Sequence, residues 1–317
     1  MDFKKLFDLT GKNAVIVGGA GGLGKLVAQA FAENGANVAI ASRTENKLQA
    51  ACEELKALTG KNAMIVGGAG GLGLLVAREF ALAGAEVCIA SRTESKLAAA
   101  CEQLKAETGK EFKYYVMDAG VEEQVAAVAE QANKDYGHID ILVNSQGVNK
   151  KHPALEFPMD EFDLVMHDDV ASILMTCKHF GKFMKENGYG KIVNVTSVRG
   201  KIATKGPGNA AYCAAKGAVD MLTKQLASEL GPYGITVNAF GPNIMATPMM
   251  TKVFEMRAAE AGITVEQYLK NQAAGLPMRR MSDPIDCVGT ALFLAAPASD
   301  FMTGNILYPD GGLTAIG

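Results

Sequence analysis

A tandem repeat occupies the first third of the chain. Residues 10–58 and 59–107 align without a gap, and about 37 of some 49 positions are identical. Chance does not produce this similarity, so one supersecondary unit is present twice. Because only two copies occur, the repeat does not indicate a solenoid.

Each copy follows the same order of predicted elements. An apolar run at residues 14–17, repeated at 63–66, predicts a buried strand. A glycine-rich turn and an amphipathic helix ending at Gly35 follow, and then a second strand at 38–41 and a second helix. A β-α-β-α unit of this kind is the front half of a parallel-sheet nucleotide-binding domain.

The rest of the chain continues this alternation. Further strands are predicted at residues 112–117, 139–143, 191–196, 236–240 and 305–308. Helices are predicted at 122–136, 160–187 with a break near Gly181, 210–230 and 286–295. A long irregular region, helical in parts and rich in methionine, extends from about residue 245 to 283. We therefore predict an α/β fold with a doubly wound parallel sheet (Rossmann) and an extra duplicated βαβα unit.

The repeat leaves open which copy belongs to the main sheet. The second copy leads directly into the strand at 112–117, so we expect residues 59–317 to form the main domain and residues 1–58 to be the extra unit. The reverse assignment would insert extra strands that the helix at 122–136 must cross. Exchange between the near-identical copies, or domain swapping, is a third interpretation.

Both copies carry a glycine-rich turn between the first strand and the first helix. These turns contain Gly18, Gly22, Leu23 and Gly24 in the first copy, and Gly67, Gly71, Leu72 and Gly73 in the second. Glycines let the backbone approach a pyrophosphate, and the helix N-terminus supplies amide donors and a partial positive charge. A strand before the turn and a helix and second strand after it favour a dinucleotide site over a merely tight turn.

The residues after the second strand indicate which cofactor is bound. An acidic residue there would bind the adenosine ribose and disfavour a 2′-phosphate. Both copies instead have a serine and an arginine, Ser42 with Arg43 and Ser91 with Arg92. Because a guanidinium suits phosphate, we predict NADP(H) over NAD(H), although NAD(H) stays possible and the arginine can also be a solvated residue at a helix start.

A serine, a tyrosine and a lysine follow the strand at 191–196. Tyr212 and Lys216 lie four residues apart at the front of a helix, so their side chains share one face. An ammonium beside a phenol favours the phenolate, which makes the tyrosine a usable proton donor and acceptor. The hydroxyl of Ser197, at the end of the adjacent strand, can orient a substrate oxygen.

These motifs together resemble the short-chain dehydrogenase/reductase family over essentially the whole chain apart from one copy. The resemblance rests on LTGK, VGGAGGLG, the NSQG motif at 144–147, Ser197 with YCAAK, VNAFGPN and ILYPDGG. It implies hydride transfer between a nicotinamide and a carbinol or carbonyl carbon, so the chain would be an enzyme. Tetramers are usual in this family, so a homo-oligomer is expected.

The resemblance also implies a role for each matching residue. Tyr212 would be the acid/base, Ser197 the substrate hydrogen-bond partner, and Lys216 the group that binds the nicotinamide ribose. Asp118 would contact the adenine. Asn144 would steady the central strand, and Gly147 of the same motif is included with it among the candidate cofactor-binding residues.

Three positions depart from the family pattern. Val17 and Val66 replace a threonine before the first glycine, and Asn243 replaces the glycine after Pro242. The third departure is Asp169, which stands where the family usually has the asparagine of its proton relay. An ionised carboxylate near Lys216 would weaken the effect of the ammonium on the tyrosine, so we hypothesise slower turnover at neutral pH than an asparagine would allow.

The segment from Lys205 to Asn238 leans towards the sugar-acid and polyol dehydrogenases of the family, those similar to gluconate 5-dehydrogenase. The substrate would then be a small carbonyl or alcohol compound. A 3-oxoacyl-(acyl carrier protein) reductase is the alternative enzyme. A non-catalytic cofactor-binding or assembly protein is the alternative of another class, because of the duplication and Asp169.

Composition excludes several other classes of protein. The 317 residues are 49% hydrophobic and carry a formal net charge of −3, which gives no electrostatic basis for binding nucleic acid or an anionic membrane. No apolar run approaches the length of a membrane span, and the N-terminus does not resemble a signal peptide. The six cysteines form no CxxC pair and the four histidines have no metal-ligand spacing, so we expect reduced thiols, no metal site and a cytoplasmic location.

Overall fold

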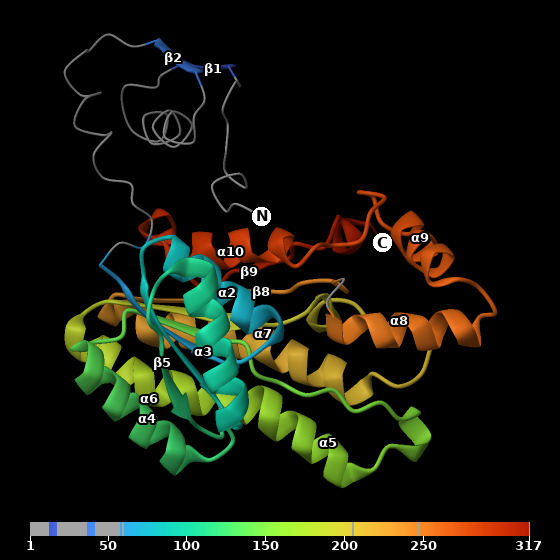
Figure 1. The fold of residues 1–317 in the computed structure, drawn as a ribbon, viewed down its shortest axis with the longest axis horizontal. Helices are drawn as coiled ribbons and strands as arrows, with labels where there is room; N and C mark the ends of the chain where they lie inside the picture. Colours follow the sequence, from blue (N-terminus) through green and yellow to red (C-terminus); the bar gives the residue numbers. More distant parts are fainter. Residues whose placement is uncertain are drawn as a thin grey trace. The chain divides into compact units, whose positions relative to one another are not determined.

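The computed structural model describes residues 13–17, 37–41, 58, 60–204, 206–245 and 248–316, and the chain divides into two units, Met1–Ala57 and Leu58–Gly317 (Figure 1). In the first unit, β1 (Asn13–Val17) and β2 (Asn37–Ala41) form a parallel pair with Asn13 opposite Asn37. The remainder of the first copy, including Gly18, Gly22, Leu23, Gly24, Ser42 and Arg43, lies outside the described residues. Beyond this pair of strands, the extra βαβα unit is therefore not shown.

The second unit is built on a seven-stranded sheet in which every neighbouring pair of strands is parallel. Its order is β5-β4-β3-β6-β7-β8-β9. The strands are β3 (Asn62–Val66), β4 (Glu86–Ser91), β5 (Lys113–Val116), β6 (Ile141–Asn144), β7 (Gly190–Val195), β8 (Ile235–Phe240) and β9 (Ile306–Leu307). The strand order reverses between β3 and β6, which is where open α/β sheets form their ligand crevice.

Helices cover both faces of this sheet (Figure 1). One face carries α2 (Gly71–Leu82), α3 (Glu94–Thr108) and α10 (Ile285–Ala295), and the other carries α4 (Glu122–Tyr136), α6 (Ser172–Asn187) and α7 (Ala210–Leu230). Further helices are α5 (Met159–Met166), α8 (Pro248–Glu260) and α9 (Val265–Ala274). Short turns of helix are η3 (Ala154–Glu156), η4 (His167–Ala171), η5 (Val198–Gly200), η6 (Gly231–Tyr233), η7 (Pro297–Ser299) and η8 (Leu313–Ala315).

The central strands are apolar because helices bury both of their faces. Every residue of β6 is buried, and so are the last four residues of β3. Such strands read as continuous apolar runs rather than as alternating patterns. A large cluster of buried side chains joins these strands to α4 and α6 and includes Phe180 and Met184. The sheet is thereby a rigid support for the loops at the carboxyl ends of its strands.

The parallel, Rossmann-like sheet predicted from the sequence is confirmed, and most element boundaries differ by one or two residues. One detail was wrong. Gly181 does not break a helix but lies inside α6, where a Cβ would make an ordinary contact, 3.8 Å from Leu230 at the end of α7. The actual interruption is η4, a π-helical turn between α5 and α6. The region from residue 245 to 283 is helical in parts, as predicted, because α8 and α9 lie within it.

Candidate active site

A glycine turn joins β3 to α2 at the point where the strand order reverses. Gly67 has φ +82°, and a Cβ there would lie 2.9 Å from the backbone nitrogen of Gln146. A Cβ on Gly73 would lie 2.4 Å from the carbonyl oxygen of Gly67. Side chains are therefore excluded where the turn meets the loop after β6. Gly71 begins α2, so the helix N-terminus opens onto this turn and can hold a pyrophosphate.

Ser91 ends β4 and Arg92 follows it, and both line the same cleft. The Arg92 side chain is 60% exposed, and its Nη1 atom is 3.7 Å from Oδ2 of Asp168. This long contact leaves the guanidinium able to bind a phosphate. Lys96, one helical turn further on, also lines the cleft. Its spacing from Arg92 at a helix start was a signal that the sequence analysis missed.

Asp118 follows β5 and is half-buried at the cleft wall. Its Oδ1 atom accepts a hydrogen bond of 3.0 Å from the backbone N–H of Gly120. Its own N–H donates to Oε1 of Gln124 at 2.8 Å. These bonds fix the carboxylate at the carboxyl end of β5, beside the crevice that would receive the adenosine end of a dinucleotide.

Asn144 lies behind the cleft rather than in its wall. It is fully buried at the end of β6, where its Oδ1 atom accepts from Thr176 at 2.8 Å and its Nδ2 atom donates to Asn194 at 2.9 Å. Asn194 in turn donates to Thr223 at 3.0 Å. This chain of hydrogen bonds ties α6, β6, β7 and α7 together. This network supports the site. Asn194 follows the apolar residues Ile192 and Val193 in β7 and was a signal that the sequence pattern offered.

Ser197, Tyr212 and Lys216 all line the cleft. Ser197 follows β7, and its Oγ atom accepts a hydrogen bond of 3.2 Å from the N–H of Arg199 at the start of η5. Tyr212 and Lys216 lie in the first two turns of α7, with the Lys216 ammonium 5.4 Å from the centre of the Tyr212 ring. The fold thus brings Ser197 together with Tyr212 and Lys216, although η5 and a loop lie between Ser197 and α7 in the sequence.

Asp169 forms a buried ion pair with Lys216. Its Oδ2 atom is 3.0 Å from Nζ of Lys216, and the two side chains are 0% and 5% exposed. Its Oδ1 atom accepts a hydrogen bond of 2.6 Å from the N–H of Val148. Burial raises the pKa of Asp169 above its ordinary value, and the Lys216 ammonium and the Val148 N–H oppose this shift. Lys216 therefore has a buried counter-ion.

The π-helical turn η4 explains how Asp169 reaches this position. Such turns insert an extra residue into a helix and commonly occur at functional sites. Here Asp169 points inward against Gly147, where φ is +153° and a Cβ would lie 2.9 Å from both carboxylate oxygens. Gly147 therefore leaves the room that the carboxylate needs.

The cleft has a volume of about 1700 Å³, enough for a dinucleotide and a small substrate. Its outer wall includes the cationic side chains of Lys151, Arg199 and Arg257. Met245 and Met281, from the methionine-rich region, also line it. Among the described residues, no group of three or more histidine, cysteine, aspartate or glutamate side chains is arranged to hold a metal ion. In the same part of the chain, no helix is both long and apolar enough to cross a bilayer.

Comparisons with known proteins agree with this geometry. A family model described as enoyl-(acyl carrier protein) reductase matches residues 66–314, and one described as short chain dehydrogenase matches residues 12–64. The chain is 32% identical over 310 residues to 5-keto-D-gluconate 5-reductase of Escherichia coli K12, with 97% of each chain covered.

Two solved structures resemble the chain closely enough to bear on the cofactor. A gluconate 5-dehydrogenase from Burkholderia cenocepacia J2315, in complex with NADP and tartrate, has a TM-score of 0.75 and 32% identity, covering 83% of this chain and 98% of that one. An NAD⁺-bound xylitol dehydrogenase has a TM-score of 0.73 and 30% identity, covering 79% and 98%. The chain belongs to the short-chain dehydrogenase/reductase family.

Proposed function

We propose that this chain is an NADP(H)-dependent oxidoreductase that interconverts a secondary alcohol and a ketone of a sugar acid or polyol. The observation that carries the proposal is the meeting of Ser197, Tyr212 and Lys216 in one cleft with the Gly67 turn. The relatives named for 5-keto-D-gluconate and gluconate support a sugar acid as substrate. NAD(H) remains a usable cofactor, in line with the NAD⁺-bound xylitol dehydrogenase.

The residues of the cleft fit both parts of the reaction. A bound nicotinamide supplies the hydride for reduction of the ketone and accepts it in the reverse direction. Tyr212 gives a proton to the carbonyl oxygen during reduction and takes it back from the hydroxyl during oxidation. Ser197 donates a hydrogen bond to that oxygen, and Lys216 stabilises the phenolate of Tyr212.

The polar side chains of the outer cleft suit a hydroxylated carboxylic acid. Lys151 and Arg199 supply positive charge, whereas Arg257 is paired with Glu260 at 3.0 Å. The side-chain amides of Asn149 and Asn209 are joined by a hydrogen bond of 3.3 Å and offer further donors and acceptors for hydroxyl groups. A sugar acid needs both kinds of group, whereas an acyl thioester needs an apolar channel.

We also assign the cofactor to the second copy of the repeat. The turn with Gly67, Gly71, Leu72 and Gly73 would hold the pyrophosphate, and Ser91 with Arg92 would bind the 2′-phosphate. Residues 59–317 then form the catalytic domain, and residues 1–58 are the extra copy.

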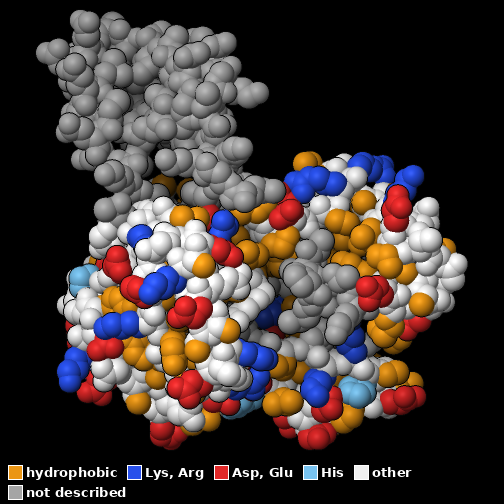
Figure 2. Space-filling view, viewed as in Figure 1, with side chains coloured by type: hydrophobic (Ala, Val, Ile, Leu, Met, Phe, Trp, Pro, Cys, Tyr) orange, Lys and Arg blue, Asp and Glu red, His pale blue; other side chains and the backbone are white. Residues whose placement is uncertain are grey.

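Assembly and location follow from the surface and the thiols. Met221 on α7 is 63% exposed, Leu174 on α6 is 46% exposed, and Phe301 before β9 is fully exposed, so we propose a homo-oligomer, with a tetramer as the expected form. Charges of both signs are mixed over the visible face of the molecule (Figure 2). The five cysteines among the described residues are free thiols, which favours the reducing cytoplasm.

The test is oxidation of NADPH, followed by absorbance, with keto-gluconates, keto-polyols and acetoacetyl thioesters as substrates. We expect turnover of a keto-gluconate or keto-polyol and its loss in Tyr212→Phe. Turnover of thioesters alone would instead support the alternative function, a 3-oxoacyl-(acyl carrier protein) reductase. Cofactor binding without turnover of any substrate would support a non-catalytic role.

A further inference from the structure

We propose that the two copies of the repeat compete for one place in the seven-stranded sheet, between β5 and β6. In one state the second copy fills this place, as the structure shows, and in the other state the first copy fills it. The occupant of this surface is thus a named segment of the same chain, residues 10–58.

The core that receives the second copy matches the first copy almost as well. Of the buried side chains between residues 63 and 104, all but three have the identical residue in the first copy. The three exceptions put smaller apolar residues in the first copy: Val15 for Met64, Ala30 for Glu79 and Ala39 for Cys88. A smaller side chain leaves a gap but causes no clash, so the first copy fits the same place.

Three charged residues of the second copy that pair with one another are all uncharged in the first copy. In the second copy, Arg78 forms ion pairs with the buried Glu79 and with Glu107, the latter at 2.9 Å. The first copy has uncharged residues at all three positions, namely Gln29, Ala30 and Leu58. No buried charge is therefore left without its partner when the first copy occupies the sheet.

The contacts at the start of each copy are also reproduced. Asp140 accepts hydrogen bonds from Nζ of Lys61 at 3.2 Å and from the N–H of Asn62 at 2.9 Å. Lys12 and Asn13 are the same residue types at the start of the first copy. In addition, β1 pairs with β2 in the register in which β3 pairs with β4, so these two strands of the first copy match the two strands that they would replace.

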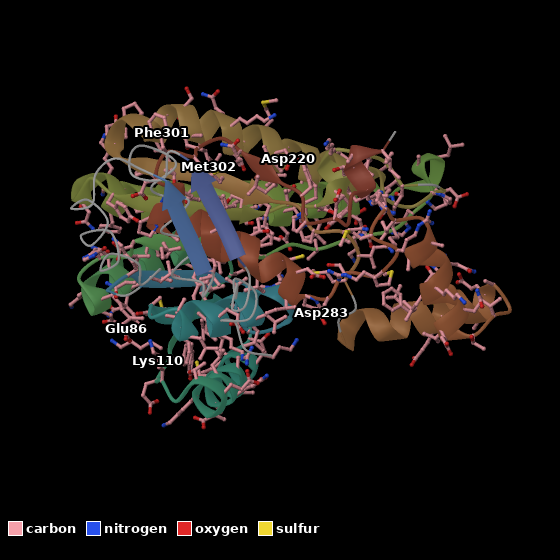
Figure 3. All side chains as sticks on the ribbon, turned by 90° about the horizontal axis from the view of Figure 1, so that it is seen from above. Glu86, Lys110, Asp220, Asp283, Phe301 and Met302 are labelled. Carbon is pink, nitrogen blue, oxygen red and sulfur yellow. The ribbon has the colours of Figure 1, made fainter. Side chains whose placement is uncertain are left out.

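The two ends of a copy lie close together, which lets a whole copy enter or leave. The N–H of Leu58 donates to the carbonyl of Ala83 at 3.3 Å, and Nζ of Lys110 donates to the carbonyl of Ala85 at 3.2 Å. Entry and exit thus meet at the turn before β4, where Figure 3 labels Glu86 and Lys110. Segments with adjacent ends can be looped out of a domain without moving the rest of it.

The junctions of the repeat have the same sequence in both states. Thr-Gly-Lys opens the copies at residues 10–12 and 59–61, and it recurs after the second copy at 108–110. Gly109 ends α3 with φ +71°, a left-handed cap that favours glycine. Gly60 is the equivalent residue after the first copy and has φ +75°. A glycine in the left-handed conformation therefore follows each copy.

The test disables each copy in the full chain. Phe80 is fully buried in α2, and Phe31 is its equivalent in the first copy, so Phe80→Asp, Phe31→Asp and the double variant form a matched set. Thermal unfolding is followed by circular dichroism. We expect each single variant to keep a cooperative transition, with Tm lowered by less than about 10 °C, and the double variant to lose it. Loss of the transition in Phe80→Asp alone would overturn the proposal.

A second pair of variants deletes one copy. Removing residues 10–58 or 59–107 leaves one copy and an unchanged Thr-Gly-Lys junction. Both chains should fold, and their Tm values should differ by less than about 10 °C. If only the chain that keeps residues 59–107 folds, the first copy cannot take the place in the sheet. Because unfolding requires neither cofactor nor substrate, failure of the proposed oxidoreductase function would not change this result.

Discussion

Replacement of Asp169 by asparagine should accelerate the proposed reaction. The variant removes the carboxylate that lies 3.0 Å from the Lys216 ammonium. An asparagine has the same shape, and its oxygen can still accept the hydrogen bond from the N–H of Val148. The variant removes the negative charge, and with its oxygen towards Val148 its amide nitrogen takes the place of Oδ2 opposite the Lys216 ammonium.

The magnitude follows from the distances between the groups. At an effective dielectric constant of about 20, the ammonium 5.4 Å from the Tyr212 ring centre stabilises a phenolate by roughly 3 kcal/mol. Oδ2 of Asp169 is 3.0 Å from the same ammonium, so its distance from the ring centre cannot exceed the sum of these two distances. At that largest distance its charge destabilises the phenolate by roughly 2 kcal/mol. Because only part of that energy is expressed in a transition state, we expect kcat at neutral pH to rise about tenfold.

The assay is steady-state oxidation and reduction with saturating cofactor, from about pH 5 to about pH 9. Burial raises the pKa of Asp169, so the wild-type carboxylate takes up a proton at a higher pH than an exposed aspartate would. Once it is protonated, the wild type resembles the variant. The ratio of the two rates should therefore approach one as the pH falls through this titration.

Asp163→Asn is the matched control, because Asp163 is an exposed residue of α5 and the net charge changes equally. This control should leave kcat unchanged. A fall in kcat for Asp169→Asn, or a rate equal to the wild type at neutral pH, would refute the argument that the carboxylate restrains Lys216.

Three further substitutions test other parts of the site and its support. Arg92→Asp should raise the Kd of NADPH by about tenfold to a hundredfold while leaving that of NADH nearly unchanged, as measured by fluorescence titration. Gly147→Ala should lower kcat by at least about tenfold, because the new Cβ would lie 2.9 Å from both oxygens of Asp169 at a φ of +153°. Asp220→Asn tests the buried carboxyl of Asp220, which Figure 3 labels and which accepts a hydrogen bond of 2.8 Å from Tyr308. Burial raises the pKa of Asp220, so the folded wild type loses stability as the pH rises and this carboxyl loses its proton. The Tm of the variant relative to wild type should therefore be higher at about pH 7 than at about pH 4.

Local patterns were sufficient to predict the order of strands and helices. Helix α7 begins and ends where the sequence predicted, because its apolar period is regular and Gly231 follows its last residue. The strands of the sheet were also found, since each is a short apolar run between glycines or polar residues. The π-helical turn η4 was not, because one extra residue in a helix leaves no distinct pattern in a single sequence.

Contacts between distant residues limited what could be predicted about the site. The spacing of Tyr212 and Lys216 placed them on one face of a helix, and the structure shows that face turned to the cleft. The network from Thr176 through Asn144 to Asn194 joins residues far apart in the chain, and only the folded sheet brings them together. Propensity and spacing do not contain that information.

The repeat shows the same limit in another form. Two segments with nearly the same sequence have the same local preferences, so no local pattern can decide which one completes the sheet. The decision depends on differences at a few buried positions, above all Glu79 and its partner Arg78. A buried ion pair contributes little net stability in many proteins, because desolvation offsets the attraction between the charges. The smaller Val15, Ala30 and Ala39 would leave gaps where the second copy has Met64, Glu79 and Cys88, so packing favours the second copy, and the two deletion variants measure by how much.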